Sequence, residues 1–426
     1  MAPRENFVSR IRATLGHRDY GLYALGNMLS LIGNWTQRTT IGWLMWDVTE
    51  STLLVGLVVF LELFPAVVIA PFAGAIADRW SRARIIRVTH CVAAVLAFGF
   101  AVLVLNGEWL AEAILVYAFL NGMLTGLDQP SRMSIVKTMV PASRLPTALA
   151  INSIIFNMAR FIGPPLAALF IVMGGAWLGI LIYGLGLVPL IVILGGYARR
   201  DRSAEAVASR RQQSSIMAAM GEGLRYVAFT PVVLALVLLQ AGIGISVRPV
   251  LELIPGIVGV NFGGDPDSLA ILAASVGVGA ILAGLVMSAL AEARSLRRAL
   301  WGGAFTAPFW TMAVVSLGTV EAAAVGAALL GASLVISGVA TQSLVQLMVP
   351  SEFLGRTLSI YGIVFRGCPA LGAFLLGLLA ETQGFLLPIA ILSAILWAAL
   401  VAIALVWGRR IAHGLNGSSL SEGDQA

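Results

Sequence analysis

Residues 74–84 read Gly-Ala-Ile-Ala-Asp-Arg-Trp-Ser-Arg-Ala-Arg, a charged stretch between two long apolar runs. Each run is long enough to cross a bilayer, so this stretch is predicted to be a short hydrophilic turn between two membrane helices. Gly74 lets another helix backbone come close, and Asp78 can sit at the N-terminus of a neighbouring helix, where the macrodipole favours an anion. The alternative is a positively charged loop that only fixes the topology.

The composition places the whole chain in the membrane. Hydrophobic residues make up 59% of the 426 residues and charged residues 11%, and the mean hydropathy is +0.92. These values exclude a water-soluble globule. Twelve runs reach the length of a spanning helix, which is about 20 residues. Their limits are 20–46, 52–77, 84–105, 110–136, 145–173, 176–198, 227–259, 268–291, 297–317, 320–347, 354–380 and 385–407.

The basic residues orient these spans. With both termini in the cytoplasm, all but five of the 27 basic residues fall in cytoplasmic segments, and the external loops carry only acids. Such a positive-inside pattern requires an even number of spans. The basic balance therefore predicts the orientation of the spans in the membrane and no nucleic-acid partner. Residues 1–19 are expected to be a cytoplasmic lead without a cleavable signal peptide. Cys91 and Cys368 are expected to be packing residues, with no metal or cofactor.

The chain contains an internal repeat. A shift of 209 positions aligns residues 134–156 with residues 343–365, and ten of the 23 positions are identical. A Met-Val-Pro triplet recurs at 139–141 and 348–350, which predicts the same helix-breaking turn before the fifth and the eleventh spans. An offset of half the chain indicates two parallel six-helix halves. The predicted domains are an N-terminal bundle (1–198), a cytoplasmic linker (199–222), a C-terminal bundle (223–410) and a cytoplasmic tail (411–426).

The opening stretch also carries a family resemblance. Gly-x-x-x-Asp-Arg-x-x-Arg at 74–82 resembles the signature of the major facilitator superfamily, from which Ser81 and Ala83 depart because a second glycine and a second base are expected there. The resemblance implies an all-α membrane protein of twelve helices in two pseudo-symmetric six-helix bundles, with the third, sixth, ninth and twelfth spans in the outer layer. It also implies a conformational latch made of Gly74, Asp78, Arg79 and Arg82.

Further motifs narrow the resemblance to one branch. Residues 33–38, 129–133 and 364–367 resemble the transmembrane secretion effector branch, which includes enterobactin exporters and macrolide efflux proteins. Ala-x-x-x-Gly-Pro-x-x-Ala-Ala at 159–168 resembles an antiporter signature that implies export, although close helix packing explains the same small residues. Many drug antiporters have an Arg-x-x-Gln-Gly motif in the fourth span, and its arginine relays protons. This chain has Ala118-x-x-Asn121-Gly122 instead, so the arginine is missing.

Ionisable residues inside membrane spans are costly and are therefore functional candidates. Asp128 and Arg132, four residues apart in the cytoplasmic half of the fourth span, are expected to form a local ion pair that supports the gate. The spacing of Arg248 and Glu252 fits either a pair or a substrate role. Glu62 either carries protons or pairs with Arg38 or Arg160. The proton-coupling candidates are Glu62, Glu252 and Asp128.

The substrate is predicted from the excess of arginine at mid-depth. Four arginines stand against two glutamates, and a guanidinium suits carboxylate, phosphate or catecholate groups. The expected substrate-binding residues are Arg38, Arg160, Arg248 and Arg366. The predicted function is a monomeric secondary transporter that exports an anionic or siderophore-like metabolite by proton antiport with alternating access. The alternatives are a multidrug or macrolide efflux pump and a transport-dead sensor of the same fold.

An enzyme or an ATP-driven pump is not expected. The chain has no Gly-x-x-x-x-Gly-Lys loop to cradle a nucleotide phosphate. Its three histidines, His17, His90 and His413, lack metal-ligand spacing and are each predicted to be surface residues near the cytoplasm.

Overall fold

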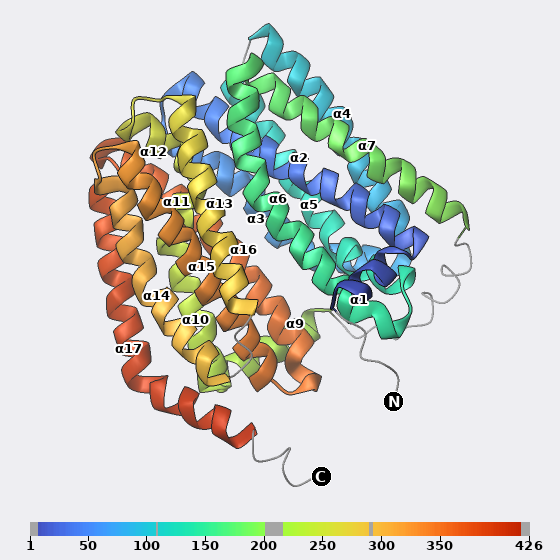
Figure 1. Cartoon of the computed structure of the whole chain (residues 1–426), viewed down its shortest axis with the longest axis vertical. Helices are drawn as coiled ribbons and strands as arrows, with labels where there is room; N and C mark the ends of the chain where they lie inside the picture. The colour runs from blue at the N-terminus through green and yellow to red at the C-terminus, as the bar shows by residue number, and fades with distance from the viewer. Residues whose placement is uncertain (1–6, 108–109, 201–215, 289–292, 419–426) are drawn as a thin grey trace. The chain divides into compact units, whose positions relative to one another are not determined.

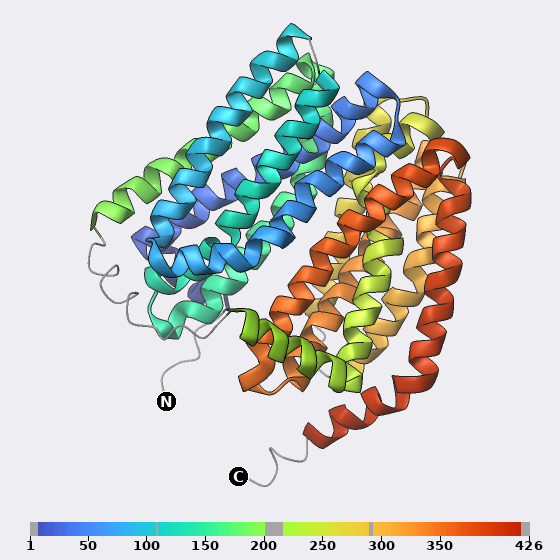
Figure 2. The ribbon, with the colours of Figure 1, turned by 180° about the vertical axis from the view of Figure 1, so that it is seen from behind.

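A computed structural model describes residues 7–107, 110–200, 216–288 and 293–418, and these residues are almost entirely helical (Figure 1). They fall into two compact units. Unit 1 comprises Met1–Thr49 and Leu61–Gln212, and unit 2 comprises Glu50–Phe60 and Gln213–Ala426. Within each unit the long helices lie side by side, as the view from behind also shows (Figure 2).

The helices of the first half follow the predicted apolar runs closely. They are α1 (Phe7–Leu15), α2 (Arg18–Thr49), α3 (Thr52–Arg79), α4 (Arg82–Asn106), α5 (Leu110–Met139), the 3-10 turn η1 (Ala142–Arg144), α6 (Leu145–Gly174) and α7 (Ala176–Arg200). The helices α4 and α6 end at Gly107 and Gly175, whose φ angles are 76° and 101°. Glycine takes such angles without steric penalty, so it ends a helix sharply.

The second half is also helical. Its elements are α9 (Ile216–Phe229), α10 (Pro231–Ser246), α11 (Arg248–Glu252), α12 (Ile254–Asn261), α13 (Pro266–Ser288), α14 (Ala293–Ser316), α15 (Val320–Met348), α16 (Ser351–Gln383) and α17 (Leu386–Ser418). The helix α9 begins inside the predicted linker, and the linker's other described residues are the last two of α7. The predicted tail at 411–418 continues α17.

The predicted seventh span, 227–259, is not one helix. Its residues form the end of α9, all of α10 and α11, and most of α12, with interruptions at Thr230, Val247 and Leu253. Pro249 and Pro255 lie in the first turns of α11 and α12. Proline lacks an N–H and clashes with the preceding turn, so each one starts a new helix. The apolar character of the run did not distinguish these breaks from a kinked helix.

Two turns can be compared with their predictions. The helix α3 continues to Arg79 and α4 begins at Arg82, so the turn expected at 74–84 is confined to Trp80 and Ser81. The Met-Val-Pro triplets behave alike in both halves. The helices α5 and α15 end at Met139 and Met348, and Pro141 and Pro350 have nearly the same φ and ψ, −59° and 152° against −55° and 147°. The repeat therefore sets the same backbone turn twice.

Ten of the described helices are long and apolar enough to cross a membrane, judged by length and composition. Two further predicted spans, 20–46 and 297–317, are helical as α2 and α14, of 32 and 24 residues. The helix α2 carries many polar residues along its length, and three arginines lie in the first two turns of α14. Their lower hydropathy has a structural meaning for α2, because its polar residues face the interior of unit 1.

Candidate functional site

The helix α2 carries a polar stripe into the core of unit 1. Tyr23, Asn27, Ser30 and Gln37 are spaced by four, three and seven residues and are all at most 5% exposed. These spacings keep the side chains on one side of a helix. The helices α6 and α7 pack against α2, and Gly33 lets α7 approach so closely that a Cβ there would lie 3.0 Å from the Tyr183 Cα. The stripe is thereby enclosed.

A buried ion pair joins α2 to α3. The Arg38 Nε lies 3.2 Å from the Glu62 Oε2, and the two side chains are 13% and 7% exposed. The helix α5 packs closely against α3 at Glu62, since a Cβ at Gly122 would meet the Glu62 carbonyl oxygen at 2.6 Å. Of the partners that the sequence left open for Glu62, the structure pairs it with Arg38. Each charge offsets the desolvation of the other, so the pair holds only while both are ionised.

An indole ring lies beside this pair. The guanidinium carbons of Arg38 and Arg160 lie 5.2 and 5.6 Å from the centroid of the Trp35 ring, within the range of cation–π attraction. Phe156 contacts the same ring edge-on at 6.0 Å. The predicted substrate residues Arg38 and Arg160 are thus brought together by Trp35, which was not predicted. Two guanidiniums here face one carboxylate, a local excess of positive charge that suits an anionic group.

The small residues of α6 make this arrangement possible. Ala159, Gly163, Ala167 and Ala168 are buried, and a Cβ at Gly163 would come within 2.4 Å of the Trp35 Cβ and 2.9 Å of the Thr36 nitrogen. The packing explanation of the 159–168 motif is therefore confirmed. The antiporter explanation stays a prediction.

Gly163→Ala is expected to destabilise unit 1 by about 1–3 kcal/mol, because the added methyl group has no space against the α2 backbone. The measurement is thermal unfolding of the purified protein in detergent. Gly99→Ala is the matched control, since a Cβ at that position of α4 meets nothing within 4 Å. It should leave the unfolding temperature unchanged or raise it slightly. An equal loss in both variants would mean that the α2–α6 contact is not tight.

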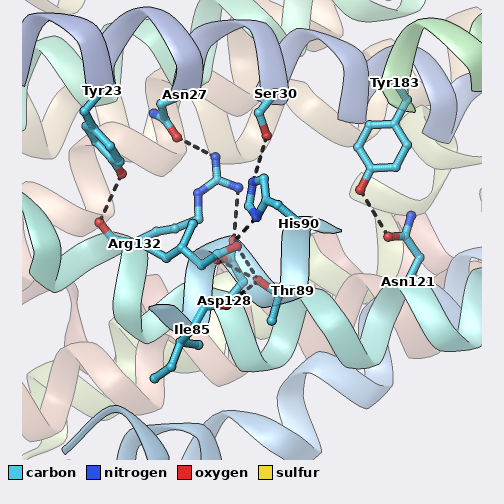
Figure 3. A network of polar contacts seen from close by, with 11 residues as sticks. Tyr23, Asn27, Ser30, Ile85, Thr89, His90, Asn121, Asp128, Arg132 and Tyr183 are labelled. Atoms are coloured by element: carbon cyan, nitrogen blue, oxygen red, sulfur yellow. Dashed lines mark hydrogen bonds and ion pairs between the residues drawn. The ribbon is translucent and has the colours of Figure 1, made fainter. Parts of the chain in front are cut away.

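A second polar cluster lies nearer the N-terminal end of α2, between α2, α4 and α5 (Figure 3). The Arg132 Nη1 lies 3.2 Å from the Asp128 Oδ2, which confirms the predicted pair. Arg132 also donates to the Asn27 Oδ1, and the Thr89 hydroxyl donates to the Asp128 Oδ1 at 3.4 Å. The arginine therefore ties α5 to α2 as well as to its own helix.

His90 is the group in this cluster that the sequence analysis placed wrongly. It was predicted to lie at the surface, but it is 4% exposed, with its Nε2 3.2 Å from the Ser30 hydroxyl and its Nδ1 3.8 Å from the Asp128 Oδ1. Its position four residues after Ile86 on the buried face of α4 explains the difference. Ser30, a hydroxyl residue of α2 that lies at the same depth as His90, was the sequence feature that could have indicated a buried position.

A third group of polar side chains connects α2, α5 and α7. The Asn121 amide donates to the Gln37 Oε1 at 2.8 Å. The Tyr183 hydroxyl donates to the Asn121 Oδ1 at 3.2 Å, as Figure 3 shows. All three residues are buried. The Asn121-Gly122 pair thus has a structural role in the interior of unit 1. Tyr183 and His90 come from the sixth and third predicted spans, so these spans also contribute polar groups to the interior of unit 1.

Three of the mid-depth candidates, Arg248, Glu252 and Arg366, belong to unit 2, and all three are partly exposed. Arg248 begins the short helix α11, donates from Nη1 to the Phe365 carbonyl oxygen at 3.2 Å, and lies 3.6 Å from the centroid of the Phe365 ring. In the sequence repeat, Phe365 aligns with Phe156 of unit 1. In both units, then, a guanidinium group lies near the aromatic cluster that contains the repeated phenylalanine.

The predicted latch is only partly described. Gly74, Asp78 and Arg79 form the end of α3, and their side chains lie outside the described part of the structure. Arg82 begins α4 and is partly exposed. The latch therefore stays a prediction.

Comparison with known proteins identifies the relatives of this chain. The family described as transmembrane secretion effector matches residues 13–414. The staphyloferrin A transporter of Staphylococcus aureus is 26% identical over 152 residues, which are 34% of this chain and 37% of that protein. The multidrug efflux pump Tap of Mycolicibacterium fortuitum is 24% identical over 376 residues, which are 83% of this chain and 87% of that protein.

Solved structures show the same fold. The peptide transporter POT superposes with a TM-score of 0.71 at 14% identity, over 92% of this chain and 95% of that one. The nucleoside transporter NupG superposes with a TM-score of 0.69 at 13% identity, over 91% and 98%. The protein is a multi-pass membrane transport protein and not an enzyme. Since the family match extends over nearly the whole chain, the protein belongs to the transmembrane secretion effector family of the major facilitator superfamily.

Proposed function

We propose that this protein exports a small, oxygen-rich anionic metabolite of siderophore type in exchange for protons, by alternating access. The observation that carries the proposal is the buried Arg38–Glu62 pair beside Trp35 and Arg160. A carboxylate neutralised by one guanidinium, with a second guanidinium beside the same ring, can exchange partners when an anion arrives. The substrate then takes the arginines while the carboxylate takes a proton, so that no unpaired charge stays buried.

The topology that we propose completes this picture. The helices α2 and α14 span the membrane together with the ten apolar helices, which gives twelve spans in two six-helix bundles with both termini in the cytoplasm of a bacterium. The transporter works as a monomer in the inner membrane. Gly74, Asp78, Arg79 and Arg82 act as the latch at the cytoplasmic side, and Asp128 and Glu252 are further proton-coupling candidates. Arg248 and Arg366 contribute the substrate contacts of unit 2.

A second candidate function, multidrug efflux, is favoured by a different observation. The similarity to the pump Tap extends over 87% of that protein, whereas the similarity to the staphyloferrin A transporter extends over 37%. The indole of Trp35 and the exposed ring of Phe156 offer an aromatic surface that also suits lipophilic cations.

The deciding experiment measures proton flux in proteoliposomes under an imposed pH gradient. Catecholate and carboxylate siderophores are added in one series and lipophilic cationic drugs in the other. Proton movement with the anions supports the proposed function. Movement with the cations alone contradicts it and favours the multidrug pump, and movement with neither contradicts both.

Arg160→Gln is expected to raise the half-saturating concentration of an anionic substrate by about tenfold or more, because one charge-assisted hydrogen bond is lost. The maximal rate should change less, since Glu62 and Arg38 stay in place. Arg12→Gln, which removes an exposed arginine of α1 in the same unit, is the control and should have no effect. Unchanged half-saturation for every anionic substrate in the Arg160 variant would contradict the assignment.

A further inference from the structure

His90 of α4 is a buried group that the transport scheme above does not use. It lies in the interior of unit 1, at 4% exposure, and both of its ring nitrogens face polar partners (Figure 3). The Nε2 lies 3.2 Å from the Ser30 hydroxyl of α2, and the Nδ1 lies 3.8 Å from the Asp128 Oδ1 of α5. Histidine is the side chain whose unperturbed pKa puts its change of charge between about pH 5 and pH 8.

The groups that surround His90 set the charge balance of this cluster. From α5 come the Asp128 carboxylate and the Arg132 guanidinium, which are paired at 3.2 Å. From α2 come the neutral Ser30 and Asn27 and the phenol of Tyr23, whose hydroxyl points to the Arg132 carbonyl oxygen at 3.5 Å. The helix α7 also packs against α4, and its titratable residues before Arg199 are the tyrosines Tyr183 and Tyr197. With a neutral imidazole the cluster is therefore uncharged.

A proton on His90 would disturb this balance. It adds a positive charge next to a pair that is already neutral, and an uncompensated charge in a buried site is strongly unfavourable. The imidazolium competes with Arg132 for one carboxylate, whose Oδ1 lies 3.8 Å from His90 and whose Oδ2 lies 3.2 Å from Arg132, and a single negative charge neutralises only one of the two cations. Arg132 then needs water, because its remaining side-chain partners, the Asn27 amide and the Tyr23 phenol, are neutral. Protonation of His90 and opening of the cluster to water are thus linked.

We propose that His90 is a second proton-binding group of the transport cycle, a positioning residue that acts through Asp128 to release Arg132 and open the polar cluster of unit 1. The proton comes from water on the side to which the cluster opens and returns to water when the pair re-forms. The proposal rests on proton antiport as the function. It makes Asp128 the acceptor that switches partners, and Glu62 remains the carboxyl next to the substrate.

The chain itself makes a direct test feasible, because it has only three histidines. Full-length protein labelled with carbon-13 at the histidine Cε1 is placed in lipid nanodiscs and followed by NMR from about pH 8 to about pH 5. The His90 signal is assigned by elimination with His17→Gln and His413→Gln, so His90 itself stays intact. In parallel, hydrogen exchange of the amides of residues 85–95 and 124–136, corrected for the intrinsic rate, reports opening of the cluster.

We expect the His90 signal to titrate in the same interval in which exchange of these amides increases. With one linked proton, the opening equilibrium changes by about tenfold for each pH unit within that interval. His90→Gln should remove this pH dependence, whereas His17→Gln and Ser30→Ala, which keep the imidazole, should retain it. Thermal unfolding shows whether His90→Gln is folded. If it is not, the NMR titration of the protein that keeps His90 still decides the test.

The outcomes separate this inference from the proposed function. A His90 that does not titrate between about pH 5 and pH 8 overturns the inference, as does opening with the same pH dependence in His90→Gln. In either case the proteoliposome assay can still show proton flux, and the proposed antiport then stands without His90. If no substrate drives proton flux, the proposed antiport fails whatever His90 does.

Discussion

Arg132→Ala is expected to lower the free energy of unfolding by about 3–5 kcal/mol, since it leaves the buried Asp128 carboxylate without its guanidinium partner. Asp128 is 5% exposed, and its remaining contacts are the Thr89 hydroxyl at 3.4 Å and the neutral imidazole of His90. The side chain of Arg132 also joins α5 to Asn27 of α2, so the variant loses an interhelical contact as well. Thermal unfolding in detergent measures the loss.

Two further variants test the cause of this loss. Arg84→Ala removes an exposed arginine of α4 and should have almost no effect. The double variant Asp128→Asn with Arg132→Gln replaces both charges by amides of similar shape and should regain most of the stability. If the double variant is as unstable as Arg132→Ala, the loss comes from packing and not from an unpaired charge.

Glu62→Gln is expected to reduce substrate-driven proton flux to the level of empty liposomes, because an amide cannot bind and release the transported proton. The same change leaves Arg38 with a neutral partner in a site where the two side chains are 13% and 7% exposed. Some loss of stability is therefore expected too. Proton flux and unfolding temperature must be measured on the same preparation.

The double variant Arg38→Gln with Glu62→Gln distinguishes a proton carrier from a structural pair. Both charges are gone, so folding should recover while proton flux stays absent. Glu112→Gln, which neutralises an exposed glutamate in the first turn of α5, is the control and should retain flux. Recovery of proton-coupled transport in the double variant would show that Glu62 serves only to neutralise Arg38.

Much of the helical framework follows from the sequence because membrane spans depend on a local property. A run of about 20 apolar residues must satisfy its backbone hydrogen bonds internally, and in a bilayer only a helix does so within one segment. The predicted runs at 145–173 and 176–198 accordingly match α6 and α7 within a few residues. The seventh span was the exception. Its prolines are as compatible with a kinked helix as with the separate helices α10, α11 and α12.

The charged pairs were predictable to different degrees. Asp128 and Arg132 lie one helical turn apart, so their contact follows from the spacing. Glu62 could have met Arg38 or Arg160, and only the packing of α2, α3 and α5 brings the Arg38 Nε to 3.2 Å from its carboxylate. The role of Trp35 could not be predicted either. Its ring lies near guanidiniums from two helices, and a sequence gives no distance between helices.

His90 shows where reasoning from charge alone fails. A histidine near the predicted end of a span fits the surface as well as the core, and its partners Ser30 and Asp128 lie on helices remote in sequence. The stripe of Tyr23, Asn27, Ser30 and Gln37 on α2 has helical spacing, but it was not singled out from the sequence. The polar partners of this stripe lie on α4, α5 and α7, and only the packing of these helices decides which partner each residue meets.

The sequence by itself determined the class of protein, the placement of most helices, the repeated Met-Val-Pro turn and the residues whose charge makes them functional candidates. These are properties of local composition and spacing, and they act within one helix or one turn. The tertiary structure alone decided which charges on different helices meet, that His90 is buried, and that Gly122 and Gly163 bring helices into contact around Glu62 and Trp35. These contacts join residues far apart in the chain, and they depend on how side-chain volumes fit together, which no single segment encodes.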